Sequence, residues 1–272
     1  MKGVKMKTKT IVIANQKGGA GKSTTAISMA TILREKGFKT LFIDTDLQCN
    51  ASDTYGAEIE GVATLSDVIL SEKTIPAIQA IQKTEYGDMI PGDPLLRNAD
   101  TILGADHMNG TFRLADKLKE LKNETDYDYI IIDTNPAINL TLYSSLVAAD
   151  ELIATVTADR YAIQGLVQLQ DSLDAVRLRN NPNIKTMGIL ITRFAPQTIL
   201  AKGIQKELHQ IAENLGTELF DTTIRECNKV KEAQSYQMPL IKFAPTCTSY
   251  IDYESFVDEY LKLEDKNNGI EK

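Results

Sequence analysis

Five short runs of consecutive apolar residues recur along this chain, and more polar segments separate them. The runs cover residues 11–14, 41–43, 129–132, 152–156 and 187–191 and are rich in isoleucine, leucine and valine. Continuous apolar runs, unlike alternating ones, are typical of strands that are covered on both faces. They predict a buried sheet.

Helical periodicity fills several of the intervening segments. Residues 24–36 bring Ile27, Ala30 and Leu33 near one helical face and end at Gly37, a favoured residue just after a helix. Residues 112–121 and 163–178 also have a helical pattern. This alternation predicts an α/β fold, with a mostly parallel twisted sheet and helices on both faces.

The chain organisation favours one domain over the two small ones that 272 residues also allow. No repeat or Gly/Ser-rich linker divides residues 1–272, and no apolar stretch approaches the roughly 20 residues needed to cross a bilayer. Residues 1–9 form a short basic extension that leads into a strand, unlike a secretion signal. The polar tail from about residue 263 is expected to fray.

The cysteines and the charge distribution indicate the compartment and the kind of partner. Cys49, Cys227 and Cys247 are scattered and form no CxxC pair, so we expect free thiols in a reducing cytosol. The net charge of −7 argues against attraction of the whole surface to nucleic acid, but residues 172–206 carry a local balance of +5. This segment permits a basic patch, with the basic residues Arg177, Arg179, Lys185, Arg193, Lys202 and Lys206.

The most specific motif follows the first apolar run and reads Asn-Gln-Lys-Gly-Gly-Ala-Gly-Lys-Ser-Thr-Thr over residues 15–25. A strand that leads through a glycine-rich turn into a helix directs backbone amides and the positive helix end at one small volume. This arrangement predicts a phosphate-binding loop. Lys22 can reach the β- and γ-phosphates, and the Ser23 hydroxyl can ligate Mg²⁺.

The loop departs from the usual phosphate-loop pattern in two ways. Gln16 stands where glycine is usual, and a second lysine, Lys17, lies inside the loop. Two cations on one triphosphate within one subunit are largely redundant, so Lys17 could instead stabilise the phosphates held by a facing subunit. The alternative is a solvated lysine beside a chance glycine turn.

Two further motifs place carboxylates at strand ends. Asp44 and Asp46 follow the second apolar run with a spacing that puts both on one side of the strand. Asp133 ends the third run, as in a Walker B strand that holds Mg²⁺ through water. Solvated turn aspartates, or a capping role for Asp133, are the alternative interpretations of each motif taken alone.

Together these motifs resemble the deviant Walker A ATPases, and in particular the ParA/Soj partition branch. The resemblance extends over residues 10 to about 261 and includes segments 146–151, 160–166, 229–233 and 239–241, and Pro245. The chain departs from the family pattern at Leu47 and Asn135, where proline is usual, and at Cys49, where glycine is usual.

The resemblance implies a role for each matching position. Lys17 acts in trans across a nucleotide-sandwich homodimer, Lys22 stabilises the phosphates, and Asp46 positions the attacking water. Asp44 and Asp133 support Mg²⁺ together with Ser23. ATP or ADP is held by Lys17, Gly18, Gly19, Ala20, Gly21, Lys22, Ser23 and Thr24. The family position also makes the neighbourhoods of Thr192 and Pro245 candidates for contact with adenine.

The resemblance further implies a slow ATP hydrolase that a ParB-like partner stimulates and that binds DNA non-specifically, with Lys229 at a basic position of the family. It is expected in the cytoplasm, on the nucleoid when ATP is bound, and not at a membrane. One alternative is a positioning ATPase resembling MinD, although the end of this chain is acidic where anionic lipid requires lysine. The other is a metabolic or redox enzyme on the same scaffold.

Overall fold

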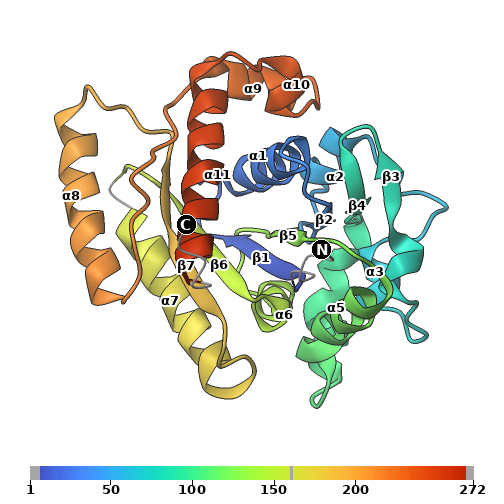
Figure 1. Ribbon diagram of the computed structural model, residues 1–272. Coiled ribbons are helices and arrows are strands. Elements are labelled where there is room, and N and C mark those ends of the chain that lie inside the picture. Colours follow the sequence, from blue (N-terminus) through green and yellow to red (C-terminus); the bar gives the residue numbers. More distant parts are fainter. Residues whose placement is uncertain (1–6, 160–161, 268–272) are drawn as a thin grey trace, which may run out of the picture.

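A computed structural model describes residues 7–159 and 162–267, and within them a seven-stranded sheet forms the centre of the molecule (Figure 1). The spatial order is β3-β4-β2-β5-β1-β6-β7, and all neighbours pair in parallel except β3 and β4. The strands are β1 (Lys9–Ala14), β2 (Thr40–Asp44), β3 (Gln82–Thr84), β4 (Gly87–Ile90), β5 (Tyr129–Asp133), β6 (Glu151–Thr157) and β7 (Lys185–Thr192).

Helices cover both faces of this sheet. In Figure 1, α1 and α11 lie above it, and α5, α6 and α7 lie below. The helices are α1 (Lys22–Glu35), α2 (Asn50–Tyr55), α3 (Leu65–Ile69), α4 (Ala99–Ala105), α5 (Arg113–Glu124), α6 (Leu140–Ala148), α7 (Ala162–Arg179), α8 (Ile199–Asn214), α9 (Asn228–Ser235), α10 (Leu240–Phe243) and α11 (Thr248–Asn267). Short 3₁₀ helices lie at Ala77–Ala80, Pro94–Asn98 and Gly110–Phe112.

The sheet separates two apolar cores because successive side chains of a strand point to opposite faces. In β1, Ile11 and Ile13 pack with α1 and α11, whereas Val12 and Ala14 pack with the helices of the other face. Each of the five predicted strands and each of the three predicted helices is present. The α/β class, with a mostly parallel sheet between two helical layers, is confirmed.

The expectation of a frayed end from about residue 263 is wrong for residues 263–267, where α11 continues to Asn267. Glu264 is buried and accepts a hydrogen bond of 2.6 Å from the hydroxyl of Tyr129. Lys9, at the start of β1, forms ion pairs with both Glu264 and Glu151, and Tyr260 donates to Glu151 over 2.6 Å. Burial lowers the pKa of Lys9, but the two carboxylates together outweigh burial and raise it.

Some predicted features lie outside the described residues: most of the basic extension, Arg160 and Tyr161 of the family-like segment, and the last five positions. Within the part that the structure describes, no helix is both long and apolar enough to cross a membrane.

Candidate functional site

The turn of residues 15–21 joins β1 to α1 and depends on two glycines. Gly19 and Gly21 have φ of +75° and +78°, in the left-handed region that side chains disfavour. A Cβ at Gly21 would also lie 3.2 Å from the side chain of Thr192. In the described chain no side chain caps α1, which starts directly after Gly21, so its first amides remain available to an anion.

Lys22 lies inside this turn with only 6% of its surface exposed. Its ammonium donates a hydrogen bond of 3.2 Å to the backbone carbonyl of Lys17. Burial lowers the pKa of Lys22, while the charges of Asp133 and Asp46 oppose that shift. The ammonium is therefore close to both carboxylates and to the loop backbone, where it can move onto a phosphate.

Asp44 and Asp133 are register partners at the carboxyl ends of β2 and β5. Asp44 is fully buried and accepts hydrogen bonds from the Ser52 hydroxyl at 2.7 Å, the Ser52 amide at 2.9 Å and the Asp46 amide at 3.0 Å. Burial raises the pKa of Asp44 to about 6, although these hydrogen bonds oppose the rise. Asp46 is half-buried at the loop entrance and accepts from the Gln48 amide at 3.0 Å.

Asp133 has no comparable support. Within the described residues neither of its buried carboxylate oxygens accepts a hydrogen bond. Burial first, and then the charge of Asp44, hold its pKa well above the ordinary value. The Ser23 hydroxyl lies beside it and opposes that rise without a hydrogen bond of normal geometry. A buried carboxylate without partners beside a hydroxyl is a good fit for a hard cation.

A cation here would depend on more than protein ligands. The described residues contain no group of three His, Cys, Asp or Glu side chains that could hold a metal ion. Mg²⁺ usually takes one or two protein oxygens and completes its octahedron with water and phosphate oxygens. Ser23 and Asp133, with Asp44 behind them, fit that pattern once a phosphate occupies the turn.

Lys17 is held in its own chain. Its ammonium forms an ion pair with Asp159 and donates to the Thr157 hydroxyl over 3.2 Å. Its backbone amide donates to the Asn15 side chain at 2.9 Å, and that side chain also donates to the Thr155 carbonyl. The lysine therefore rests against the end of β6, while its backbone stays fixed to the turn.

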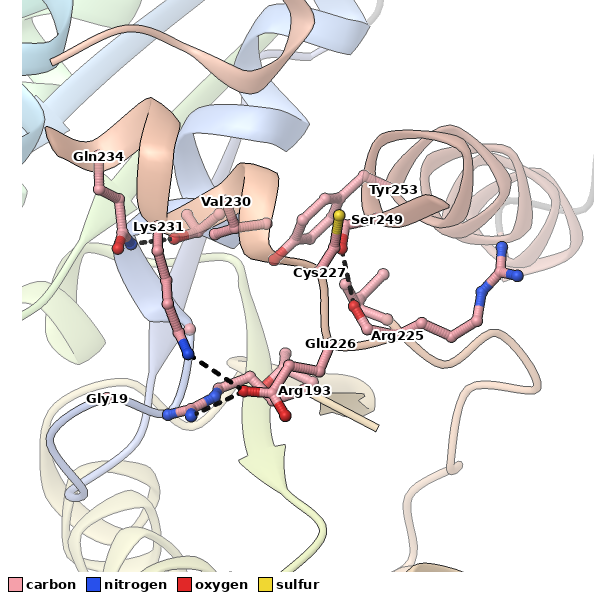
Figure 2. Close-up of a pocket in the computed structure, with 14 residues that line it drawn as sticks. Gly19, Arg193, Arg225, Glu226, Cys227, Val230, Lys231, Gln234, Ser249 and Tyr253 are labelled. Carbon is pink, nitrogen blue, oxygen red and sulfur yellow. Dashed lines mark hydrogen bonds and ion pairs between the residues drawn. The ribbon is translucent and has the colours of Figure 1, made fainter. Parts of the chain in front are cut away.

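A pocket of about 160 Å³ lies between the turn, α9 and α11 (Figure 2). Arg193 and Lys231 converge on the carboxylate of Glu226, at 3.1 and 3.6 Å. Thr192 donates to the carbonyl of Ala20 at 3.0 Å and so connects the pocket to the turn. The lining residues are Gly19, Gly21, Thr24, Thr192, Arg193, Ile224, Arg225, Glu226, Cys227, Val230, Lys231, Gln234, Ser249 and Tyr253.

The structure brings together the sequence-predicted phosphate and carboxylate residues at one edge of the sheet, because β1, β2 and β5 are parallel and end there. The Thr24 hydroxyl accepts a hydrogen bond of 3.0 Å from Gln234, and Thr192 lines the pocket, whereas Pro245 does not. Most of the pocket wall, and Ser52 with its support of Asp44, were not predicted from the sequence motifs.

The basic side chains of segment 172–206 differ in their partners and in their exposure. Arg177 donates to the Ile184 carbonyl and the Thr186 hydroxyl, and Arg193 belongs to the pocket. The exposed side chains are those of Arg179, Lys185, Lys202 and Lys206, together with Arg193 at the pocket. On α9, Lys229 pairs with Glu232 at 2.6 Å and lies over the Phe243 ring.

Comparison with known proteins shows the family to which this chain belongs. Residues 8–186 match a family model described as an AAA domain. The chromosome partitioning protein ParA of Caulobacter vibrioides is 30% identical over 259 residues, covering 94% of this chain and 95% of that protein. The ParA of Myxococcus xanthus is 32% identical over 245 residues, which cover 89% and 84%.

Solved structures with a similar fold agree with the sequence comparison. Apo McdA from Cyanothece has a TM-score of 0.81 and 26% identity, covering 93% of this chain and 99% of that one. A plasmid partition protein from Borrelia burgdorferi has a TM-score of 0.72 and 28% identity, covering 94% and 99%. With its phosphate-binding turn and strand-end carboxylates, this chain therefore belongs to the ParA/Soj family of P-loop ATPases.

Proposed function

We propose that this chain is a single ATPase domain that hydrolyses ATP to ADP and phosphate and uses the nucleotide to switch a DNA-binding homodimer in plasmid or chromosome partition. One observation carries the proposal: open loop amides, a buried lysine and three carboxylates meet at one edge of the sheet. The site residues proposed are Lys17, Gly18, Gly19, Ala20, Gly21, Lys22, Ser23, Thr24, Asp44, Asp46 and Asp133.

The reaction is in-line attack of water on the γ-phosphorus, with cleavage of its bond to the β–γ bridging oxygen. The turn amides and Lys22 bind the phosphate oxygens and offset the charge that develops in the transition state. Asp46 orients the attacking water. Mg²⁺, when bound through Ser23 and Asp133, neutralises phosphate charge.

The neighbouring pocket is the proposed site of the adenosine. It adjoins the turn through Gly19 and Gly21, and its wall includes the Tyr253 ring and the aliphatic side chain of Val230. ATP as the nucleotide is supported by a Cyanothece McdA structure that is an ATP complex, which is 25% identical to this chain with a TM-score of 0.80.

Dimerisation follows from the second lysine. Lys17 lies at the rim of the turn with its side chain 31% exposed, so it can reach a nucleotide presented by a second copy. We propose that each Lys17 completes the site of the other protomer. The variant Lys17→Gln should keep monomeric ADP binding and lose ATP-driven dimerisation, and normal dimerisation by that variant would reject the role.

The dimer is proposed to bind DNA phosphates through exposed basic residues and to be reset when a ParB-like partner stimulates hydrolysis. Lys229, Lys202 and Lys206 are the candidates on α9 and α8. The localisation that follows is cytoplasmic, with ATP-bound molecules on the nucleoid. A membrane-anchoring role for α11 fits less well, because this helix buries Tyr253, Phe256 and Tyr260 in the core.

The proposal is tested by DNA retardation with ATP, ADP or no nucleotide across a salt series. We expect retardation with ATP alone, and a steep loss of affinity as salt rises because phosphate contacts release counterions. Equal retardation with ADP and ATP, or none with either, would reject a nucleotide-switched DNA-binding protein.

A further inference from the structure

Lys17 is bound within its own protomer by Asp159 and Thr157, and this contact must change if Lys17 is to reach a second protomer. Thr157 is the last residue of β6 and is buried, and Asp159 follows two positions later. The Asp159 amide donates to the Thr157 carbonyl at 2.8 Å, and the Thr157 hydroxyl donates to the Asp159 carboxylate. Asp159 is therefore fixed on the strand end, with its carboxylate directed at Lys17.

The main chain of Lys17 is fixed to the same strand. Asn15 accepts from the Lys17 amide and donates to the Thr155 carbonyl of β6. Gln16 donates to the Gln168 carbonyl of α7 at 2.9 Å. Because these contacts hold the Lys17 amide and the two residues before it, the ammonium can change partner by rotation of its own side chain, without a rearrangement of the turn.

We propose that Asp159, with the Thr157 hydroxyl, holds Lys17 in its own protomer, and that this ion pair exchanges for the triphosphate of the partner before the dimer closes. The inference rests on the proposed function of Lys17. Asp159 is a positioning residue, which acts through Lys17 and sets how much nucleotide is needed for dimerisation.

The size of the effect follows from exposure. The side chains of Lys17 and Asp159 are 31% and 38% exposed, so water screens the pair, and its loss shifts an equilibrium by about two- to fivefold. A symmetric dimer releases two such pairs. Loss of both should therefore lower the dimer dissociation constant by about four- to twenty-five-fold.

The test is analytical ultracentrifugation of the full chain titrated with AMPPNP and Mg²⁺. The variant Asp159→Asn keeps the shape of the side chain and removes its charge, so it should dimerise more tightly by the stated factor. The variant Asp159→Glu keeps a carboxylate and should restore the behaviour of the unaltered chain. Asp258→Asn is the matched control, because Asp258 forms an ion pair of comparable exposure with Lys36 at the far end of α1.

Salt separates this effect from a structural one. The charge that Asp159→Asn removes is the one that pairs with Lys17, so the difference between the unaltered chain and this variant should shrink as ionic strength rises, with ADP affinity unchanged. Equal or weaker dimerisation of Asp159→Asn, or a difference that salt does not alter, would overturn the proposal. If the unaltered chain stays monomeric with AMPPNP, the proposed dimer itself fails, and the exchange fails with it.

Discussion

The substitution Asp44→Asn should change how the stability of the nucleotide-free protein depends on pH. Asp44 is fully buried, and its pKa rises from 3.8 to about 6 on folding. The folded state therefore holds this proton more tightly than the unfolded chain does. The resulting stabilisation is complete below pH 3.8 and is lost as the pH rises through 6. At 1.36 kcal/mol for each pKa unit, the total loss is about 3 kcal/mol.

Only part of this total loss of stability falls between pH 5 and pH 7.5. Between pH 5 and pH 7.5 the unaltered protein should lose about 1.4 kcal/mol through Asp44. The asparagine variant should not show this loss. Removal of the Asp44 charge also lowers the pKa of Asp133, because that charge helps to raise it. The second effect has the same sign as the first.

Urea unfolding at the two pH values measures the difference, with Asp258→Asn on the surface of α11 as the control. Asparagine cannot accept all three hydrogen bonds that Asp44 accepts, so the variant carries a penalty of its own that is the same at both pH values. The variant must therefore gain on the unaltered protein as pH rises. A difference in unfolding free energy that stays constant from pH 5 to pH 7.5 would refute the reasoning.

Three further outcomes are expected. Asp46→Ala should still bind ATP and should accumulate the dimer, because the water is no longer oriented; gel filtration with ATP that shows only monomer would contradict the role of Asp46. Lys229→Glu should weaken binding to all DNA sequences about equally, and normal binding at low salt would remove this lysine from the interface. With a thiol-specific chromophore at pH 8, Cys227 should react well before Cys49. Burial raises the pKa of Cys49 to about 12, whereas backbone and side-chain hydrogen-bond donors outweigh burial and lower the pKa of Cys227. Peptide mapping that shows Cys49 reacting faster than Cys227 would contradict this order.

The parts of the fold that the sequence predicted are those with a strong local pattern. Apolar runs located five strands, and the glycine-rich turn located the phosphate site, because each motif depends on residues that are adjacent in the chain. β3 and β4 were missed because Gln82–Thr84 is polar and Gly87–Ile90 has only two apolar residues, Met89 and Ile90. Such short strands, at and next to the edge of the sheet, form through pairing with their neighbours more than through their own sequence.

The pocket and the helical structure of residues 263–267 were missed for a different reason. Arg193 and Glu226 are 33 positions apart and meet only when α9 covers the turn. The polar sequence near Glu264 indicated fraying, but its partners Lys9 and Tyr129 lie at the opposite end of the chain and in β5. Contacts between distant segments leave no local pattern, so single-sequence reasoning cannot anticipate them.

Cys49 shows how a family substitution is accommodated. The position, where the family usually has glycine, adopts a φ of 56° in the left-handed region, and the thiol is buried with a hydrogen bond of 3.5 Å to the Leu47 carbonyl. A side chain in this conformation costs about 1–2 kcal/mol. The loop after Asp46 thus keeps a glycine-like shape without glycine.

The contact between the two ends of the molecule limits how the protein can be engineered. Lys9 begins the strand that leads into the phosphate-binding turn, and Glu264 holds Lys9 from the last turns of α11. Truncation before residue 264 would remove the carboxylate that pairs with Lys9 and accepts a hydrogen bond from Tyr129 at the base of that strand. Affinity tags and fluorescent fusions should accordingly be joined beyond Asn267, and a shortened version would be expected to misreport nucleotide affinity even though every phosphate-binding residue is intact.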